Sequence, residues 1–214
     1  MPVLPSSLQI INASNCESLE DAGAYSQLVS LKTLILSGCS KLEKFPDISQ
    51  HMPCLQELCL DGTAITELPP SIGYATKLEI LDLKNCRKLR SLPSSICKLT
   101  LLHTLSLSGC LDLGKLPALP SSLEIINASN CQSLEDISPQ SVFLIFGGSI
   151  FGNCFKLTKF QSTMEGDLES MAAHVNQEIW RSTFDRVSSP WVTLEYIYIY
   201  IYIYIYIYFL YKKN

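Results

Sequence analysis

A motif of about 23 residues recurs along this chain, and it constrains the fold more than any other feature. Its clearest copy begins at Leu31 and reads LKTLILSGCSKLEKFPDI, with the spacing L-x-x-L-x-L-x-x-C-x-x-L-x-x-F/L-P. Leu34 and Leu36 alternate as residues of a short strand do, which puts both side chains on one face. A single turn of this kind cannot bury its own apolar face, so copies must stack above and below it.

Six copies of the motif are present. Their first leucines are separated by 23, 24, 23, 24 and 21 residues, within the range of about 20–29 residues typical of leucine-rich repeats. The third copy is one residue shorter after Thr63, and Ile65 and Leu68 restore the register. The pattern predicts an α/β leucine-rich-repeat solenoid, with short parallel strands on a concave face and irregular or 3-10 turns on a convex face. Within residues 1–137 the copies start at Leu8, Leu31, Leu55, Leu78, Leu102 and Leu123.

Alternation along each expected strand separates core positions from exposed ones. The exposed positions line the concave sheet, the side on which repeat proteins commonly bind partners. For any single residue, a solvated position without a partner is the simpler interpretation, whereas binding is favoured for the face as a whole. The candidate protein-binding residues are Thr33, Ile35, Ser37, Glu57, Cys59, Asp61, Ile80, Asp82, Lys84, Thr104, Ser106, Ser108, Ile125, Asn127 and Ser129.

Five of the nine cysteines occupy the same repeat position, which argues against disulfides. Their sulfurs are expected to form a file about 4.8 Å apart rather than pairs. Buried thiols suit a reducing compartment, and the N-terminal sequence MPVLPSSLQII lacks the features of a secretory signal. We therefore expect the protein in the cytoplasm or the nucleus. The five residues are Cys16, Cys39, Cys86, Cys110 and Cys131.

No pattern in the sequence predicts a catalytic, cofactor or metal site. His51, Cys54 and Cys59 resemble half of a zinc site, but the repeat register separates them and no fourth ligand has a suitable spacing. The sequence contains neither G-x-x-x-x-G-K-[ST] nor G-x-S-x-G. A net charge of −4, with no basic run before the last residues, gives no footprint for nucleic acid. We expect an interaction module that is not an enzyme.

One segment occurs twice with almost no change. Residues 4–21 read LPSSLQIINASNCESLED and residues 119–136 read LPSSLEIINASNCQSLED, so only two of eighteen positions differ. Ordinary repeats in this chain share only their core positions, which favours a recent duplication over convergence on one function. No polar cap precedes the first copy, although a stable solenoid needs one. The chain therefore reads as a fragment, or as a domain preceded by another.

The period breaks after residue 137. Residues 138–192 contain a Phe-rich run and then a predicted helix over 162–187, which begins at a capping box, Ser162-x-x-Glu165. Residues 193–214 are dominated by Tyr-Ile alternation, which a TA dinucleotide repeat read in frame encodes. We interpret this tail as a translated microsatellite. A membrane span over 194–211 is disfavoured, because tyrosine prefers the membrane interface.

The repeats resemble those of plant TIR-NB-LRR disease-resistance proteins. LCLDGTAITELPPSI and LEILDLKNCRKLRSLPSSI carry the resemblance, and IINASNCQSLED followed by IFGNCFKL looks like the exit into the region after the repeats. The resemblance implies an intracellular immune receptor whose repeats and C-terminal jelly-roll domain recognise a pathogen effector or other receptor domains. The TIR and NB-ARC domains and the jelly-roll motif P-G-x-x-I-P-x-W-F are missing, so residues 138–192 are expected to be a truncated jelly-roll start.

Two other interpretations remain open at this point. The chain could derive from a duplicated and truncated gene remnant without function. It could also be the ectodomain of a membrane receptor, but that interpretation needs a signal peptide and capping cysteine pairs, which the sequence does not show.

Overall fold

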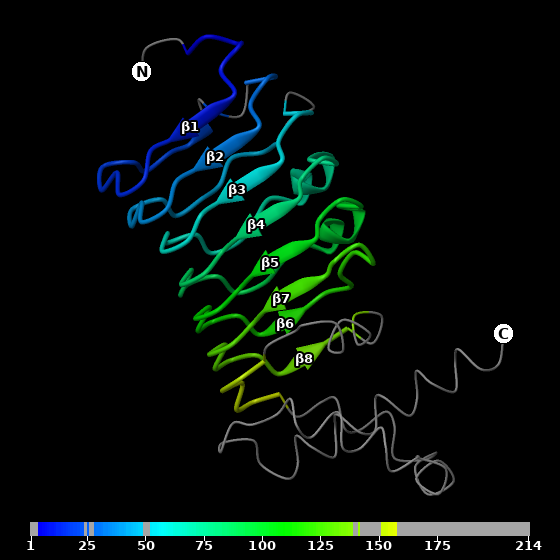
Figure 1. The fold of residues 1–214 in the computed structure, drawn as a ribbon. Coiled ribbons are helices and arrows are strands. Elements are labelled where there is room, and N and C mark those ends of the chain that lie inside the picture. The colour runs from blue at the N-terminus through cyan, green and yellow to red at the C-terminus, as the bar shows by residue number, and fades with distance from the viewer. Residues whose placement is uncertain are drawn as a thin grey trace, which may run out of the picture. The chain divides into compact units, whose positions relative to one another are not determined.

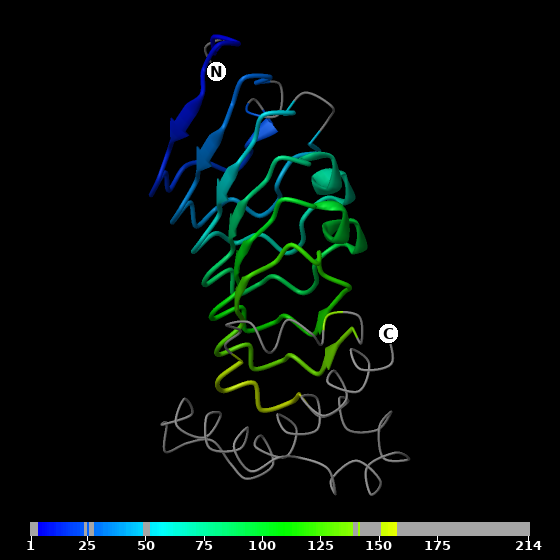
Figure 2. The same ribbon diagram turned by 45° about the vertical axis from the view of Figure 1, so that its right-hand side comes forward.

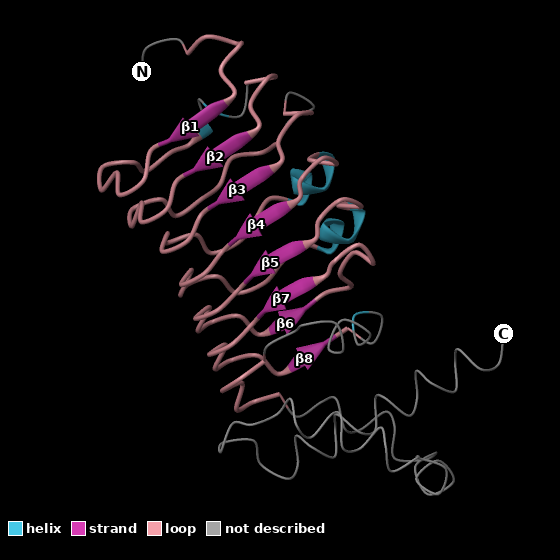
Figure 3. Cartoon of the chain, in the orientation of Figure 1, coloured by secondary structure: helices cyan, strands magenta, loops and turns pink. Residues whose placement is uncertain are grey.

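Six short parallel strands form one continuous sheet and lie side by side in the order in which they occur along the chain (Figures 1 and 3). The computed structural model describes residues 4–23, 25, 28–48, 52–138, 141 and 151–157, all of them within the unit Met1–Thr158. Each strand holds three residues, as expected when one turn of chain supplies one strand. The strands are β1 (Ile10–Asn12), β2 (Thr33–Ile35), β3 (Glu57–Cys59), β4 (Ile80–Asp82), β5 (Thr104–Ser106) and β7 (Ile125–Asn127).

The register of this sheet is the one that the leucine spacing predicts. Leu34 pairs with Leu58, Leu58 with Leu81, and Leu81 with Leu105. The central residue of each strand is buried and its two neighbours are half-buried or exposed. The expected parallel solenoid is therefore confirmed in the part of the chain that the structure describes.

Each turn leaves the sheet through a residue with a positive φ angle. Gly38, Gly62 and Gly109 have φ of 75°, 69° and 79° at this position. The other turns use asparagine, with φ between 58° and 62° at Asn15, Asn85, Asn130 and Asn153. Glycine and asparagine are the residues that tolerate this left-handed conformation. The position explains why the motif reads Gly-Cys or Asn-Cys after the strand.

A second parallel ladder, with fewer paired residues, lies on the side of the solenoid opposite the six-stranded sheet. Two-residue strands β6 (Lys115–Leu116) and β8 (Asp136–Ile137) pair there, and single bridges join Asp21 to Lys44 and Glu67 to Ser91. The 3-10 helices η2 (Pro70–Tyr74) and η3 (Ser94–Lys98) follow this ladder (Figure 2). The described residues thus form a parallel β-solenoid with 3-10 turns. This is a more specific description than the α/β class expected from the sequence. The predicted helix over 162–187 and the Tyr-Ile tail lie outside the described residues.

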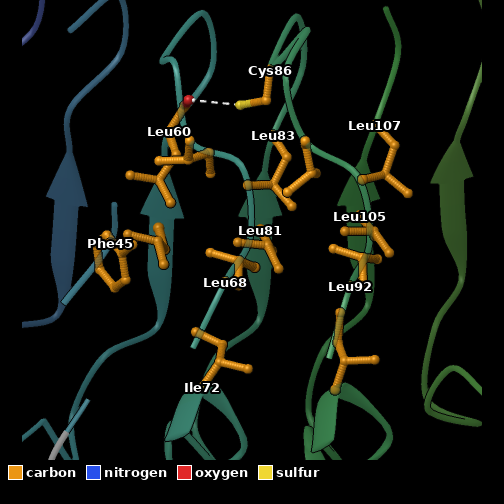
Figure 4. Packing of buried hydrophobic residues seen from close by; sticks show 14 of the residues in the cluster. Phe45, Leu60, Leu68, Ile72, Leu81, Leu83, Cys86, Leu92, Leu105 and Leu107 are labelled. Atoms are coloured by element: carbon orange, nitrogen blue, oxygen red, sulfur yellow. Dashed lines mark hydrogen bonds between the residues drawn. The ribbon is translucent and has the colours of Figure 1, made fainter. Parts of the chain in front are cut away.

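Leucines from the two ladders meet in the interior. Leu81 and Leu105 on the strands are fully buried, and they face Leu68 and Leu92, which follow the opposite ladder (Figure 4). Burying a leucine side chain contributes about 1.5–3 kcal/mol. Because every turn supplies several such residues, the stability of the array grows with the number of stacked turns.

The predicted row of cysteines is present, and their thiols donate hydrogen bonds to backbone carbonyl oxygens of the preceding turn. The Sγ of Cys86 donates to the Leu60 carbonyl oxygen at 3.1 Å (Figure 4), and the Sγ of Cys110 donates to that of Leu83 at 3.2 Å. In the third turn the Thr63 hydroxyl donates to the same Leu60 oxygen at 2.7 Å. Cys16 departs from the pattern, because it is exposed while Cys39, Cys86, Cys110 and Cys131 are buried. It lies in the outermost turn, where no described turn covers it.

Residues 151–157 add another turn to the stack. The Asn130 amide donates to the Gly152 carbonyl oxygen at 2.7 Å, in the same register as the earlier turns. The Sγ of Cys154 donates to the Ala128 carbonyl oxygen at 3.1 Å, which extends the cysteine file. The sequence signal for this turn is the Cys131 to Cys154 spacing of 23 residues.

Candidate protein-binding face

The side chains of the first and third strand residues, and of the residue two positions further on, form a surface that we call the strand face. All fifteen residues selected from the sequence lie on it, and each is half-buried or exposed. Among them Ile125 is 52% exposed. The structure therefore brings the selected residues together in three columns that run across the strands.

The first turn extends the same columns beyond the selected residues. Ile10 in β1 is 65% exposed, and Asn12 and Ser14 occupy the next two column positions. These three residues are not among the fifteen predicted from the sequence, which start at Thr33. The near-identity of residues 4–21 and 119–136 is the signal that includes them, because Ile10, Asn12 and Ser14 correspond to Ile125, Asn127 and Ser129.

The centre of the strand face, on β3 and β4, is acidic. Glu57, Asp61 and Asp82 come from two neighbouring turns, together with the exposed Lys84. Partial burial, and after it the Asp61 carboxylate, raise the pKa of Asp82, while the hydrogen bond from the Lys84 amide at 2.9 Å opposes the rise. These groups give the middle of the face a local negative charge at neutral pH.

Neighbouring hydroxyl groups hold two of these carboxylates in place. The Ser37 hydroxyl donates to Oδ1 of Asp61, and the Thr33 hydroxyl donates to Oε2 of Glu57 at 3.5 Å. Both donors come from the preceding turn, one repeat away in the sequence. Glu57 and Asp61 are therefore each contacted from the preceding turn, whereas Asp82 accepts its hydrogen bond from its own turn.

Cys59 lies among these carboxylates, and its thiol is harder to ionise than a free cysteine thiol. Burial, followed by the charges of Glu57, Asp82 and Asp61, raises the pKa of its thiol to about 12. The thiolate is the nucleophile and the metal ligand, and the raised pKa keeps Cys59 in the neutral thiol form at neutral pH. In the described part of the chain no three His, Cys, Asp or Glu side chains are arranged to hold a metal ion. His51, considered with Cys54 and Cys59, lies outside the described residues.

The first and last strands of the face, β1 and β7, carry the same pair of polar contacts beside an exposed isoleucine. Asn127 Oδ1 accepts hydrogen bonds from the Ser129 amide at 3.1 Å and from its hydroxyl at 2.8 Å. Asn12 and Ser14 make the same pair of contacts at 3.0 and 2.6 Å. The whole face thus combines carboxylates, hydroxyls and exposed isoleucines without an activated nucleophile. Such a surface can bind a protein by shape and charge.

Comparison with known protein families identifies the repeats. Residues 27–115 match the family described as "Disease resistance protein RPS4B-like, leucine-rich repeats". Among the helices of the described residues, none is long and apolar enough to cross a bilayer.

Similar proteins of Arabidopsis thaliana are much longer than this chain. Disease resistance-like protein CSA1 is 57% identical over 63 residues, which are 29% of this chain and 5% of the relative. Disease resistance-like protein DSC1 is 42% identical over 134 residues, 60% of this chain and 9% of the relative. Protein SUPPRESSOR OF npr1-1, CONSTITUTIVE 1 is 33% identical over 181 residues, 78% of this chain and 12% of the relative.

Among solved structures, a leucine-rich-repeat protein of Leptospira interrogans aligns with a TM-score of 0.38 and 17% identity, over 68% of this chain and 60% of that chain.

Proposed function

Since residues 27–115 belong to the leucine-rich repeats of plant TIR-NB-LRR disease resistance proteins, we propose that this chain is a protein-binding part of an immune receptor. Its strand face recognises a pathogen effector or another domain of such a receptor. It acts in the cytoplasm or the nucleus.

The observation that supports this proposal is the arrangement of the strand face. Three columns of exposed or half-buried side chains run across six paired strands on one rigid sheet. The buried leucines beneath them repeat almost unchanged, while the exposed positions vary from turn to turn between isoleucine, hydroxyl, carboxylate and ammonium groups. A constant scaffold with a variable surface suits recognition, because the surface can change without loss of the core.

Mutation of the acidic residues at the centre of the strand face is the most direct way to test this surface. Glu57 and Asp61 accept hydrogen bonds from hydroxyl groups but neither belongs to the leucine core. Reversing both charges should therefore leave the fold intact and change the potential that a partner meets. The matched control reverses Glu67 and Asp112, two exposed acidic residues outside the strand face.

The experiment measures pairwise binding of the full chain to individual pathogen effectors and to isolated TIR and NB-ARC domains of plant receptors. We expect at least one pair to bind, and Glu57→Lys/Asp61→Lys to weaken it by about tenfold or more, while Glu67→Lys/Asp112→Lys has little effect. Equal binding by both variants would place recognition away from the strand face. Absence of binding to every member of both sets would favour the gene-remnant interpretation.

A further inference from the structure

Two large apolar side chains remain exposed on neighbouring turns, away from the strand face. Tyr74, the last residue of η2, is 61% exposed, and Leu101, which follows η3, is 51% exposed. η2 and η3 contact each other and lie side by side on the same side of the stack in both views (Figures 1 and 2). Apolar residues that are exposed singly need no explanation. These two belong to adjoining elements, and two lysines accompany them.

The four side chains alternate between apolar and cationic across the two turns. Tyr74 and Lys98 are the last residues of η2 and η3. In each turn the amide two residues further on donates to the carbonyl oxygen of this residue, at 2.9 Å in both cases. Lys77 and Leu101 likewise share one position, directly before the first leucine of a repeat. We call these four residues, all of them exposed, the 3-10 patch.

The backbone beneath the 3-10 patch is held in place. Each 3-10 helix follows a proline, Pro69 with a φ of −66° and Pro93 with a φ of −69°. The Ser95 hydroxyl donates to the Pro70 carbonyl oxygen at 2.6 Å, which ties η3 to η2. A surface that is already ordered loses little conformational entropy when it binds a partner.

Gly73 allows the two 3-10 helices to approach each other closely. A Cβ atom at this position would lie 3.0 Å from Cβ of Ser95 and 3.4 Å from Cδ of Lys98. The aliphatic stem of Lys98 therefore lies over η2, beside the residue that precedes Tyr74. Lysine stems pack on neighbouring surface in this way while the ammonium group stays in water. The contact places a cationic group of one turn next to the aromatic residue of the other.

The 3-10 patch carries two positive charges that no described carboxylate neutralises. Residues 68–78 and 92–102 contain neither Asp nor Glu. Among the ion pairs of the described residues, none involves Lys77 or Lys98. The chain has a net charge of −4, so this side of the solenoid is locally positive on an acidic protein.

The acidic residues that flank these segments are engaged elsewhere. Asp47 accepts a hydrogen bond from the Ser71 hydroxyl at 2.8 Å. Oε2 of Glu79 lies 3.8 Å from Nε2 of His103. Glu67 lies in the second ladder, where it is bridged to the next turn. The two ammonium groups therefore remain available to carboxylates of another molecule.

We propose that the 3-10 patch is a second docking surface, separate from the strand face, and that it binds an acidic segment of a partner protein. Carboxylates of that segment pair with the ammonium groups of Lys77 and Lys98. A large apolar side chain of the same segment packs on Tyr74 and Leu101. Tyrosine is enriched among the residues that dominate binding energy at interfaces, and the two lysines steer an acidic partner toward it.

An anionic bilayer is a less suitable occupant than an acidic protein segment. Stable attachment to a bilayer needs two lipid chains, or one lipid chain together with a basic cluster. Two lysines and two apolar side chains fall short of that requirement. They match the scale of a peptide contact, in which a few side chains contribute most of the affinity.

Selection of short random peptides displayed on phage, with the full chain as the target at physiological salt, tests the proposal. Recovered peptides are synthesised with a fluorescent label, and their affinities are measured by fluorescence anisotropy. Lys77→Glu/Lys98→Glu reverses the charges of the patch, and Tyr74→Ser/Leu101→Ser removes its apolar groups.

Two control variants accompany these measurements. Lys41→Glu/Lys44→Glu makes the same change of charge at two exposed lysines of another turn. Glu57→Gln/Asp61→Asn neutralises the centre of the strand face and leaves the 3-10 patch unchanged. Circular dichroism melts verify that every variant is folded.

We expect enrichment of peptides that carry a net negative charge and at least one large apolar residue. Both variants of the 3-10 patch should weaken their binding by about tenfold or more, while both control variants have little effect. Because the strand-face variant keeps this binding, the result is independent of the proposed function.

Two outcomes would overturn the proposal. The first is an enriched pool without acidic peptides, or with acidic peptides that bind the patch variants as tightly as the parent chain. The second comes from sedimentation with vesicles of phosphatidylcholine and phosphatidylserine. Vesicle binding that Lys77→Glu/Lys98→Glu abolishes, with no acidic peptide enriched, would assign the patch to an anionic bilayer instead.

Discussion

Two glycines in one repeat should respond in opposite ways to the same substitution. Gly109 has a φ of 79°, and a Cβ atom there would overlap Oδ1 of Asn85 in the preceding turn. Gly114 has no positive φ, and a Cβ atom there meets nothing within 4 Å. Gly109→Ala should therefore destabilise the array, whereas Gly114→Ala should be neutral or stabilising.

The magnitude for Gly109→Ala has two parts. Placing alanine in the left-handed region costs about 1–2 kcal/mol, and displacing the Asn85 side chain from its rotamer costs about 0.5–1.5 kcal/mol. Together they predict a loss of about 1.5–3.5 kcal/mol in the free energy of unfolding, and a fall of roughly 3–14 °C in Tm. For Gly114→Ala, the lower entropy of the unfolded chain predicts a gain of up to about 1 kcal/mol.

Urea denaturation and thermal melts followed by circular dichroism measure both effects. A double-mutant cycle with Asn85→Gly separates the two parts, since glycine keeps the positive φ of Asn85 and removes its side chain. The cost of Gly109→Ala should fall by about 1 kcal/mol in the Asn85→Gly background. Equal stabilities for Gly109→Ala and Gly114→Ala would refute the assignment of a strained turn to Gly109.

Three other predictions follow from burial. Cys131→Ala should cost about 1–2 kcal/mol, through a lost hydrogen bond and a small cavity, while Cys16→Ala should change the urea midpoint little. Leu81→Ala should cost about 2–5 kcal/mol, and the exposed Leu101 is the control, expected within about 0.5 kcal/mol of the parent chain. Burial raises the pKa of the Cys86 thiol from 9.0 to about 11, so the unfolded chain ionises first and stability should fall as pH rises from 9 toward 11, by roughly 1.4 kcal/mol per pH unit. Urea midpoints at pH 8 and pH 10 test this last point, because Cys86→Ala should show a smaller difference between the two pH values than the parent chain.

Much of the scaffold could be predicted because its determinants are local. A spacing of two residues decides which side chains of a strand share a face, so Leu34, Leu58, Leu81 and Leu105 were assigned to the core without coordinates. The exposed columns followed from the same parity. The Gly or Asn before each cysteine has a local cause as well, because the backbone of its own turn has a positive φ angle at that position.

The periodic pattern predicted which turns adjoin, but not the polar contacts that their side chains make with one another. Ser37 donates a hydrogen bond to Asp61, which lies 24 residues further along the chain. The pKa of the Cys59 thiol is raised to about 12 first by burial and then by carboxylates of its own turn and the next. These effects depend on how neighbouring turns stack and how far the side chains between them are excluded from water.

The sequence alone thus determined the coil that each repeat adopts and the side chains that it buries. Only the tertiary structure decided which copies of a repeat are covered: Cys16 and Cys131 have nearly identical sequence surroundings, yet one is exposed and the other sealed. The physical reason is that burial in a stacked array belongs to the pair of adjoining turns, because the neighbouring turn supplies the atoms that exclude the water.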